Sequence, residues 1–130
     1  MSAKTTITIK DYFNAGGDLK LEVKDSIISE KPVGTVRVIK LKVTRKPDKY
    51  SSRLGMFAYV RNTQPGYQSL GFPQVTLTFD RYSADGKFIS RTQIDFFDVA
   101  VESSVRKGDD EEITFIAGRK SDDLAISKVP

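Results

Sequence analysis

Residues 75–94 constrain the fold more than any other part of the sequence. Val75, Leu77 and Phe79 alternate with polar residues, and a period of two places these three side chains on one face of a β-strand. The dipeptide Asp85-Gly86 follows, and Asp-Gly between two such runs is typical of a type I′ turn. We therefore expect a β-hairpin here, with this dipeptide at the centre of its turn.

The expected turn also fixes which residues of the two strands face each other. On one face the opposed residues are mostly apolar, and on the other face an acidic residue meets a basic one. Opposite-charge pairs of this kind stabilise a sheet by roughly 0.2–1 kcal/mol each. The expected pairs are Val75–Phe96, Leu77–Ile94, Phe79–Thr92 and Asp80–Arg91.

The size of the chain and its missing residue types narrow the possible functions. The 130 residues suit a single domain, which we expect to span residues 1–130. The sequence contains no His, the commonest general base and metal ligand. It contains no Cys, which removes disulfides, thiolate catalysis and Cys-based zinc sites. We therefore expect a protein that is not an enzyme and needs no cofactor or metal.

The sequence has no candidate membrane span and no recognisable targeting segment. No run of about 18 apolar residues occurs, as a transmembrane helix would need. The first residues lack the apolar core of a signal peptide. We expect a cytoplasmic or virion protein by default, and a periplasmic or secreted protein if a signal peptide has been removed.

Apolar patterns predict further strands along the chain. Val36–Thr44 requires a β-bulge near Val38, because its apolar residues change face. Leu54–Val60 is apolar on both faces, as a central strand would be. Residues 89–105 fit either a helix or two strands joined by an irregularity. The other expected strands are Thr5–Lys10, Leu19–Val23, Glu111–Ala117 and Leu124–Val129.

Short strands separated by turn signals predict an all-β fold, and we expect an immunoglobulin-like antiparallel β-sandwich of two sheets. Four segments support this expectation: Tyr59–Thr63, Val75–Phe79, Ala84–Lys87 and Gly108–Glu111. Through them the chain resembles bacterial FxLyD-type immunoglobulin-like domains. The resemblance implies an adhesion, envelope or scaffold role without an active site. The leading hypothesis is a non-catalytic structural or protein-interaction module.

A second resemblance leads to an alternative function. An N-terminal hairpin, a basic strand, a long loop, another strand and a mostly apolar tail follow in the order seen in coat proteins of single-stranded RNA phages. This resemblance implies a virion coat or decoration protein that self-assembles into a capsid and binds RNA through a basic face. It requires residues 89–105 to be helical.

Charge is unevenly distributed along the sequence. Residues 31–61 hold nine basic residues and one acidic residue, whereas residues 95–112 hold seven acidic and two basic residues. The basic block predicts a surface for nucleic acid or another polyanion. A solvated face with edge-strand lysines, or head-to-tail assembly of basic on acidic blocks, remain alternatives. The candidate polyanion-binding residues are Arg37, Lys40, Lys42, Arg45, Lys46, Lys49 and Arg53.

Two other segments have functional interpretations. The loop of residues 61–73 carries Tyr67, Leu70 and Phe72, which predict a contact patch for a protein partner or a second copy, or else a cap over the sandwich. The acidic run Asp109–Glu112 lacks EF-hand spacing, and successive strand residues point to opposite faces. We therefore expect no metal site there.

Overall fold

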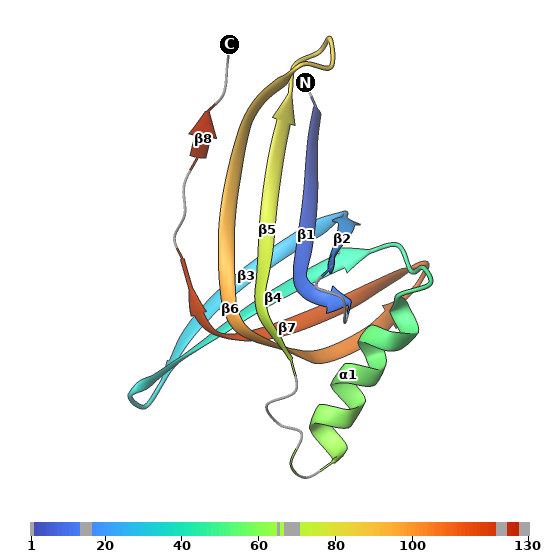
Figure 1. Ribbon diagram of the computed structural model, residues 1–130, viewed down its shortest axis with the longest axis vertical. Coiled ribbons are helices and arrows are strands. Elements are labelled where there is room, and N and C mark those ends of the chain that lie inside the picture. The colour runs from blue at the N-terminus through green and yellow to red at the C-terminus, as the bar shows by residue number, and fades with distance from the viewer. Residues whose placement is uncertain (1, 14–16, 65, 67–70, 122–124, 128–130) are drawn as a thin grey trace.

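The computed structural model describes residues 2–13, 17–64, 66, 71–121 and 125–127 (Figure 1). Within these residues the chain forms eight strands and one helix. The elements are β1 (Ser2–Phe13), β2 (Gly17–Val23), β3 (Asp25–Val33), β4 (Val36–Arg45), α1 (Ser51–Thr63), β5 (Phe72–Tyr82), β6 (Phe88–Lys107), β7 (Asp110–Lys120) and β8 (Ala125–Ser127). The helix is not long and apolar enough to cross a membrane.

The strands belong to one antiparallel sheet in the order β2-β1-β5-β6-β7-β4-β3, with β8 also paired to β6. The all-β class that the sequence predicts is therefore confirmed. The expected division into two separate sheets is wrong, because hydrogen bonding continues from β2 to β3 through every intervening strand. The resemblance to FxLyD-type domains stays a prediction.

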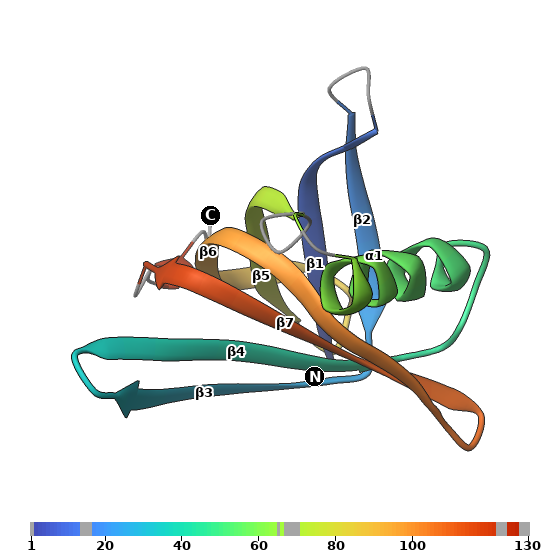
Figure 2. The same ribbon diagram turned by 90° about the horizontal axis from the view of Figure 1, so that it is seen from below.

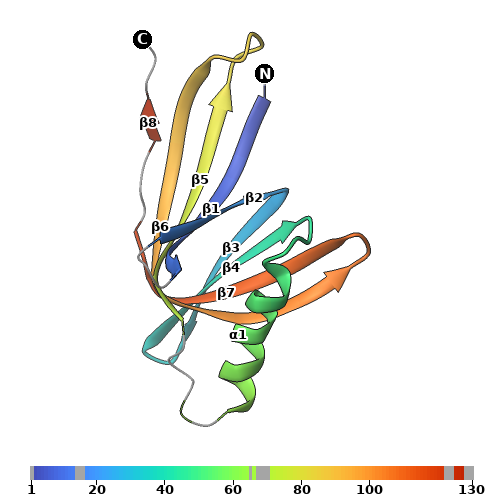
Figure 3. The same cartoon turned by 45° about the vertical axis from the view of Figure 1, so that its right-hand side comes forward.

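The sheet folds over on itself at β6. This strand is 20 residues long and pairs with β5 along its first half and with β7 along its second. Between the halves, Asp98 has a φ of 54°, which bends the strand. We call β2, β1, β5 and residues 88–97 of β6 the first layer, and the rest of β6 with β7, β4 and β3 the second layer. Their strands run in clearly different directions (Figures 1 and 3).

One apolar core lies between the layers, and α1 covers part of it. Both layers contribute the inward side of alternating strands, as a period of two requires. Helix α1 adds Leu54 and Ala58, four residues apart on one helical face, and packs against β6 (Figures 2 and 3). The fully buried members include Ile7, Ile9, Ile39, Leu41, Val43, Val75, Leu77, Phe96, Ile113 and Phe115.

A glycine allows the chain to return from α1 to β5. A side chain at Gly71 would place its Cβ only 2.0 Å from the carbonyl oxygen of Val99. Only a residue without a Cβ permits this approach, since the contact is with backbone that cannot turn away. Phe72 then starts β5 opposite Val99 on β6.

The predicted central hairpin is confirmed in its register, although its turn is different. All four expected pairs are observed between β5 and β6. The turn is wider than type I′: the N–H of Ser83 donates to the carbonyl of Lys87 at 2.8 Å, and of the two residues Asp85 and Gly86 only the glycine has a positive φ. A one-residue shift between Arg81 and Tyr82 absorbs the extra length, so the pairs beyond it are unchanged.

The predicted strand at Leu54–Val60 is wrong, because this segment lies inside helix α1. A segment that would be apolar on both faces of a strand also fits a helix in which residues four positions apart are buried. Leu54 is fully buried, whereas Met56, which would share its face in a strand, is 62% exposed. The helix therefore uses the same apolar residues with a different period.

Residues 89–105 form a strand with irregularities, which was one of the two alternatives. Asp98 bends the strand, and the register with β7 shifts between Val101 and Ser103. The helical alternative is wrong, and the phage-coat interpretation that required it fails with it.

The bulge predicted near Val38 is wrong, because β4 keeps one register with β3 from Thr44 to Val36. The tip of the β3–β4 hairpin extends past the end of its pairing with β7, which begins only at Ile39 (Figure 2). Val36 is 62% exposed there, so it needs no inward position. Strand β3 is not among the predicted strands, because it lies at an edge of the sheet and its residues are mostly exposed.

Candidate assembly surface

The basic block of the sequence lies beside its acidic block within the same chain. Strand β4 pairs with β7, which pairs with the second half of β6, so lysines and carboxylates become cross-strand neighbours. This arrangement neutralises much of the predicted basic face without any second molecule, and nothing in it favours nucleic acid. Two of the observed ion pairs join exposed lysines of the basic block to the acidic block: Lys40–Glu102 at 2.9 Å and Lys42–Glu112 at 3.9 Å. Arg37 pairs instead with Glu30 at 3.1 Å, and Lys24, which precedes the basic block, pairs with Asp110 at 2.7 Å.

Arg45 is wrongly predicted as a surface contact for a polyanion, since its side chain is 2% exposed. It forms ion pairs with the buried Glu111 and with Asp48. The hydroxyl of Ser51 donates to Glu111 at 2.9 Å, so the cluster joins β4 and β7 to the start of α1. Burial raises the pKa of Asp48, but hydrogen bonds from Arg45 and from the backbone N–H of Tyr50 outweigh it and hold that pKa below its usual 3.8.

The other three predicted cationic residues lie around the β4–α1 connection. Lys49 is 5.3 Å from the centre of the Tyr50 ring. Arg53 lies 5.0 Å from the centre of the buried Tyr12 ring. Lys46 lines a groove against β2. The structure brings these residues near one another, and their binding of a polyanion stays a prediction.

Of the three residues in the predicted contact patch of the loop 61–73, only Phe72 is among the described residues. Phe72 is 6% exposed, so its prediction as a partner contact is wrong. It packs among aromatic rings instead, 5.0 Å from Phe57 and 5.9 Å from Tyr12 between ring centres. Tyr67 and Leu70 lie outside the described residues.

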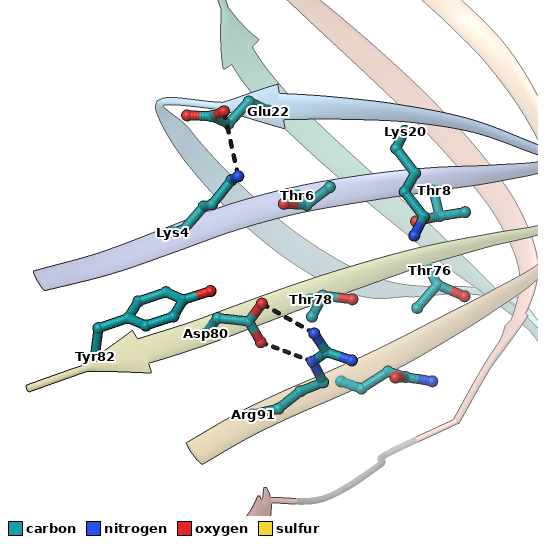
Figure 4. Close-up of a pocket in the computed structure, with 11 residues that line it drawn as sticks. Lys4, Thr6, Thr8, Lys20, Glu22, Thr76, Thr78, Asp80, Tyr82 and Arg91 are labelled. Carbon is teal, nitrogen blue, oxygen red and sulfur yellow. Dashed lines mark hydrogen bonds and ion pairs between the residues drawn. The ribbon is translucent and has the colours of Figure 1, made fainter. Parts of the chain in front are cut away.

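The outer face of the first layer is polar and forms a shallow depression of about 430 Å³ (Figure 4). Threonines of β1 and β5 face each other in two rows, Thr6 with Thr78 and Thr8 with Thr76. The sequence contains a signal for this face, because in both strands the threonines alternate with apolar residues, but these threonines are not among the predicted site residues. Charged residues flank the rows: Lys4, Lys20, Glu22, Asp80 and Arg91.

Four of the five charged groups of this face form two ion pairs. The carboxylate of Asp80 accepts two hydrogen bonds from Arg91, at 2.7 and 3.1 Å. These bonds raise the pKa of the Arg91 guanidinium above its usual value. Lys4 lies 3.6 Å from Glu22, and both are mostly exposed. The face therefore offers hydroxyls, two ion pairs and the ammonium group of Lys20, which suit contact with water or a polar surface.

The first layer ends in two strand edges. Strand β2 is at one end of the sheet order, and within the described residues it pairs with β1 alone. A groove of about 380 Å³ runs between β2 and the β4–α1 connection, lined by residues that include Leu21 and Pro47. The other edge is the first half of β6, where β8 pairs with Ser90–Thr92. An exposed strand edge is a template for another strand.

The β3–β4 hairpin adds an exposed apolar tip. Val33 and Val36 face each other across its turn and are 60% and 62% exposed. Ile27, on the β3 edge, is 58% exposed. Apolar side chains on a projecting edge hairpin are a surface that association with another molecule would cover.

Comparison with known proteins gives matches of structure only. No family model and no curated protein matches the sequence. The fold is similar to a variant of the Hcp1 protein from E. coli EAEC 042 pathovar, with a TM-score of 0.68, 11% identity, and coverage of 98% of this chain and 99% of that one. It is also similar to Hcp1 from Salmonella typhimurium, with a TM-score of 0.59, 12% identity, and coverage of 98% and 92%. An Hcp protein matches with a TM-score of 0.61, 10% identity, and coverage of 98% and 97%.

Proposed function

We propose that this chain is a type VI secretion tube subunit, a non-catalytic structural protein whose copies self-assemble into an oligomeric tube. The observation that carries the proposal is the pair of edges, β2 and the first half of β6, at the two ends of the first layer. The fold likeness to Hcp proteins over nearly the whole chain supports it.

The direction of the two edges suits closure into a ring. Each strand of the first layer is antiparallel to its neighbour, so with four strands β2 and β6 run in opposite directions. Copies related by rotation about one axis keep their strand directions relative to that axis. The β2 edge of one copy therefore meets the β6 edge of the next in antiparallel orientation, and repetition of this head-to-tail contact closes a ring.

The two faces of the first layer indicate which side lines the interior of such a ring. One face is covered by the second layer and α1, which add bulk and need the larger circumference outside. The other face carries the threonine rows and paired charges of Figure 4. We place this polar face on the inner wall, where water or a passing polar molecule contacts it.

Engineered cysteines test the ring contact, because the natural chain has no Cys. The double variant Lys20→Cys/Gln93→Cys places one thiol on each edge strand. Three interstrand spacings, about 14 Å in total, separate these strands within one copy, and a disulfide spans at most about 7 Å between Cα atoms. Any disulfide must therefore join two copies.

Oxidation of the double variant should give a ladder of covalent oligomers on a denaturing gel, and electron microscopy of the natural protein should show rings or tubes. Each single-cysteine variant is the matched control and should give no ladder beyond dimers. The proposal is overturned if light scattering finds a monomer at every concentration tested and the double variant gives no ladder.

A further inference from the structure

The edge of β6 that the proposed ring requires is already occupied in the single chain. Strand β8 pairs there in antiparallel orientation, with Ser90 facing Ser127, Arg91 facing Ile126 and Thr92 facing Ala125. The neighbour's β2 would also approach this edge in antiparallel orientation. Both strands therefore require the same row of backbone donors and acceptors on β6.

The structure separates β8 from the rest of the sheet at a defined point. The N–H of Ser121 donates to the carbonyl of Asp95 at 2.8 Å, and the N–H of Asp95 donates to the Ser121 hydroxyl at 3.1 Å. This reciprocal pair fixes the chain just after β7 ends. Strand β8 can therefore leave β6 without disturbing the pairing of β6 with β7.

The lengths of the competing strands favour exchange. β8 has three residues, whereas β2 has seven. A three-residue strand makes few ladder hydrogen bonds, and a neighbouring β2 would offer a longer ladder together with side-chain contacts. Association costs translational and rotational freedom, so the internal strand is favoured in a dilute single chain and the neighbour at high local concentration.

We propose that β8 is an internal substitute for the β2 strand of the next copy, and that it holds the subunit unassembled until a neighbour displaces it. This inference rests on the proposed function and adds to it a regulatory role for the C-terminal segment. The occupant that replaces β8 is a second copy of this chain, because the β2 edge of that copy has the required direction.

A reversible covalent lock tests the proposal. Ser90 and Ser127 face each other, and the double variant Ser90→Cys/Ser127→Cys changes each by one atom. Oxidised glutathione should close a disulfide within one chain, which mass spectrometry detects. The locked protein should stay monomeric in light scattering under conditions where the natural chain assembles, and a reducing agent should restore assembly.

The matched control is Thr6→Cys/Thr78→Cys, which joins β1 to β5 at facing positions and changes no residue of the two outer edge strands β2 and β6. Its oxidised form should assemble as the natural chain does. A chain ending at Ser121 provides a second measurement and should assemble at a lower protein concentration than the full chain.

The outcomes distinguish this proposal from the tube proposal. If the oxidised Ser90–Ser127 lock assembles as readily as its reduced form, or if removal of residues 122–130 does not lower the concentration needed, β8 is not a substitute strand. The tube proposal then stands. If neither the natural chain, the control nor the shortened chain assembles, the tube proposal fails and this inference fails with it.

Discussion

Two of the arginine–carboxylate pairs of this protein, Arg45–Glu111 and Arg91–Asp80, lie in different layers of the sheet and in different surroundings. Arg45 and Glu111, in the second layer, are 2% and 3% exposed. Arg91 and Asp80, in the first layer, are 47% and 9% exposed. Both pairs join neighbouring strands, yet only the first is closed off from water. Charges interact more strongly in a dry interior, and an unpaired charge there costs more free energy. Removing one partner should therefore destabilise the fold more at the buried pair than at the exposed pair.

The same contrast extends to the layers as wholes. Charges of the second layer are paired across β4, β7 and β6, and the Arg45 cluster ties these strands to α1. The first layer leaves the β2 edge without a partner strand and covers the β6 edge with three residues. The comparison suggests that the second layer stabilises the subunit while the first remains available for contact with other copies.

The largest effect should come from removing one partner of the buried pair. Glu111→Ala leaves Arg45 with only the partly exposed Asp48, and we expect a loss of about 3–5 kcal/mol in the free energy of unfolding. Urea denaturation followed by circular dichroism measures it. The control Arg45→Met/Glu111→Leu removes both charges and should lose much less. Equal losses in the two variants would contradict the assigned role of burial.

The next largest effect tests whether residues 51–63 form a helix or a strand. Leu54→Ala opens a cavity under α1 and should cost about 2–5 kcal/mol. Met56→Ala, two residues away on the exposed side, should change stability by less than about 0.5 kcal/mol. A strand would place both side chains on one face, so similar losses from the two changes would contradict the helix. Thermal and urea unfolding of both variants provide the measurement.

The first layer could be predicted from sequence better than the second. Apolar and polar residues alternate clearly along its strands. The position of Asp85-Gly86 between β5 and β6 predicts one register, and that register matches both the apolar pairs and the charged pair. The expected strands Thr5–Lys10 and Leu19–Val23 follow from the same alternation and are observed as a hairpin in which Ile7 faces Leu21. Local patterns suffice there because each strand has one buried face and one wet face.

The second layer and α1 depend on contacts between segments that are far apart in the sequence, and local patterns do not reveal these contacts. Leu54–Val60 fits a strand or a helix equally until its packing partner β6 is known. The basic block predicted an open cationic face because its carboxylate partners, such as Glu102 and Glu111, are some 60 residues away in the chain. The edges of the candidate assembly surface could not be predicted either, since the order of strands in the sheet decides them.

A smaller effect is expected for the exposed counterpart of the buried pair. Asp80→Ala removes two hydrogen bonds to Arg91, but the guanidinium is already 47% exposed and can turn into water. We expect a loss of about 1–2 kcal/mol, well below that of Glu111→Ala. The matched control Lys4→Ala, in a pair whose members are 50% and 72% exposed, should be nearly neutral. If Asp80→Ala lowers the free energy of unfolding as much as Glu111→Ala does, the buried pair of the second layer and the exposed pair of the first layer stabilise the fold equally, and the proposed contrast between the layers is wrong.

The smallest effect concerns Asp48, which shares Arg45 with Glu111 but is 41% exposed. Because its pKa in the folded protein lies below the usual 3.8, the ionised form stabilises the fold above that pH, and this contribution is lost as the pH falls through the folded pKa. Asp48→Asn should therefore cost less than about 1 kcal/mol at neutral pH, because solvent screens the exposed carboxylate. The difference from the natural protein should shrink below about pH 4 in urea denaturation measured at several pH values. A difference that stays constant with pH would show that Asp48 does not stabilise the fold through its carboxylate charge. The different burial of Asp48 and Glu111 would then not explain why the two partners of Arg45 contribute unequally to the free energy of unfolding.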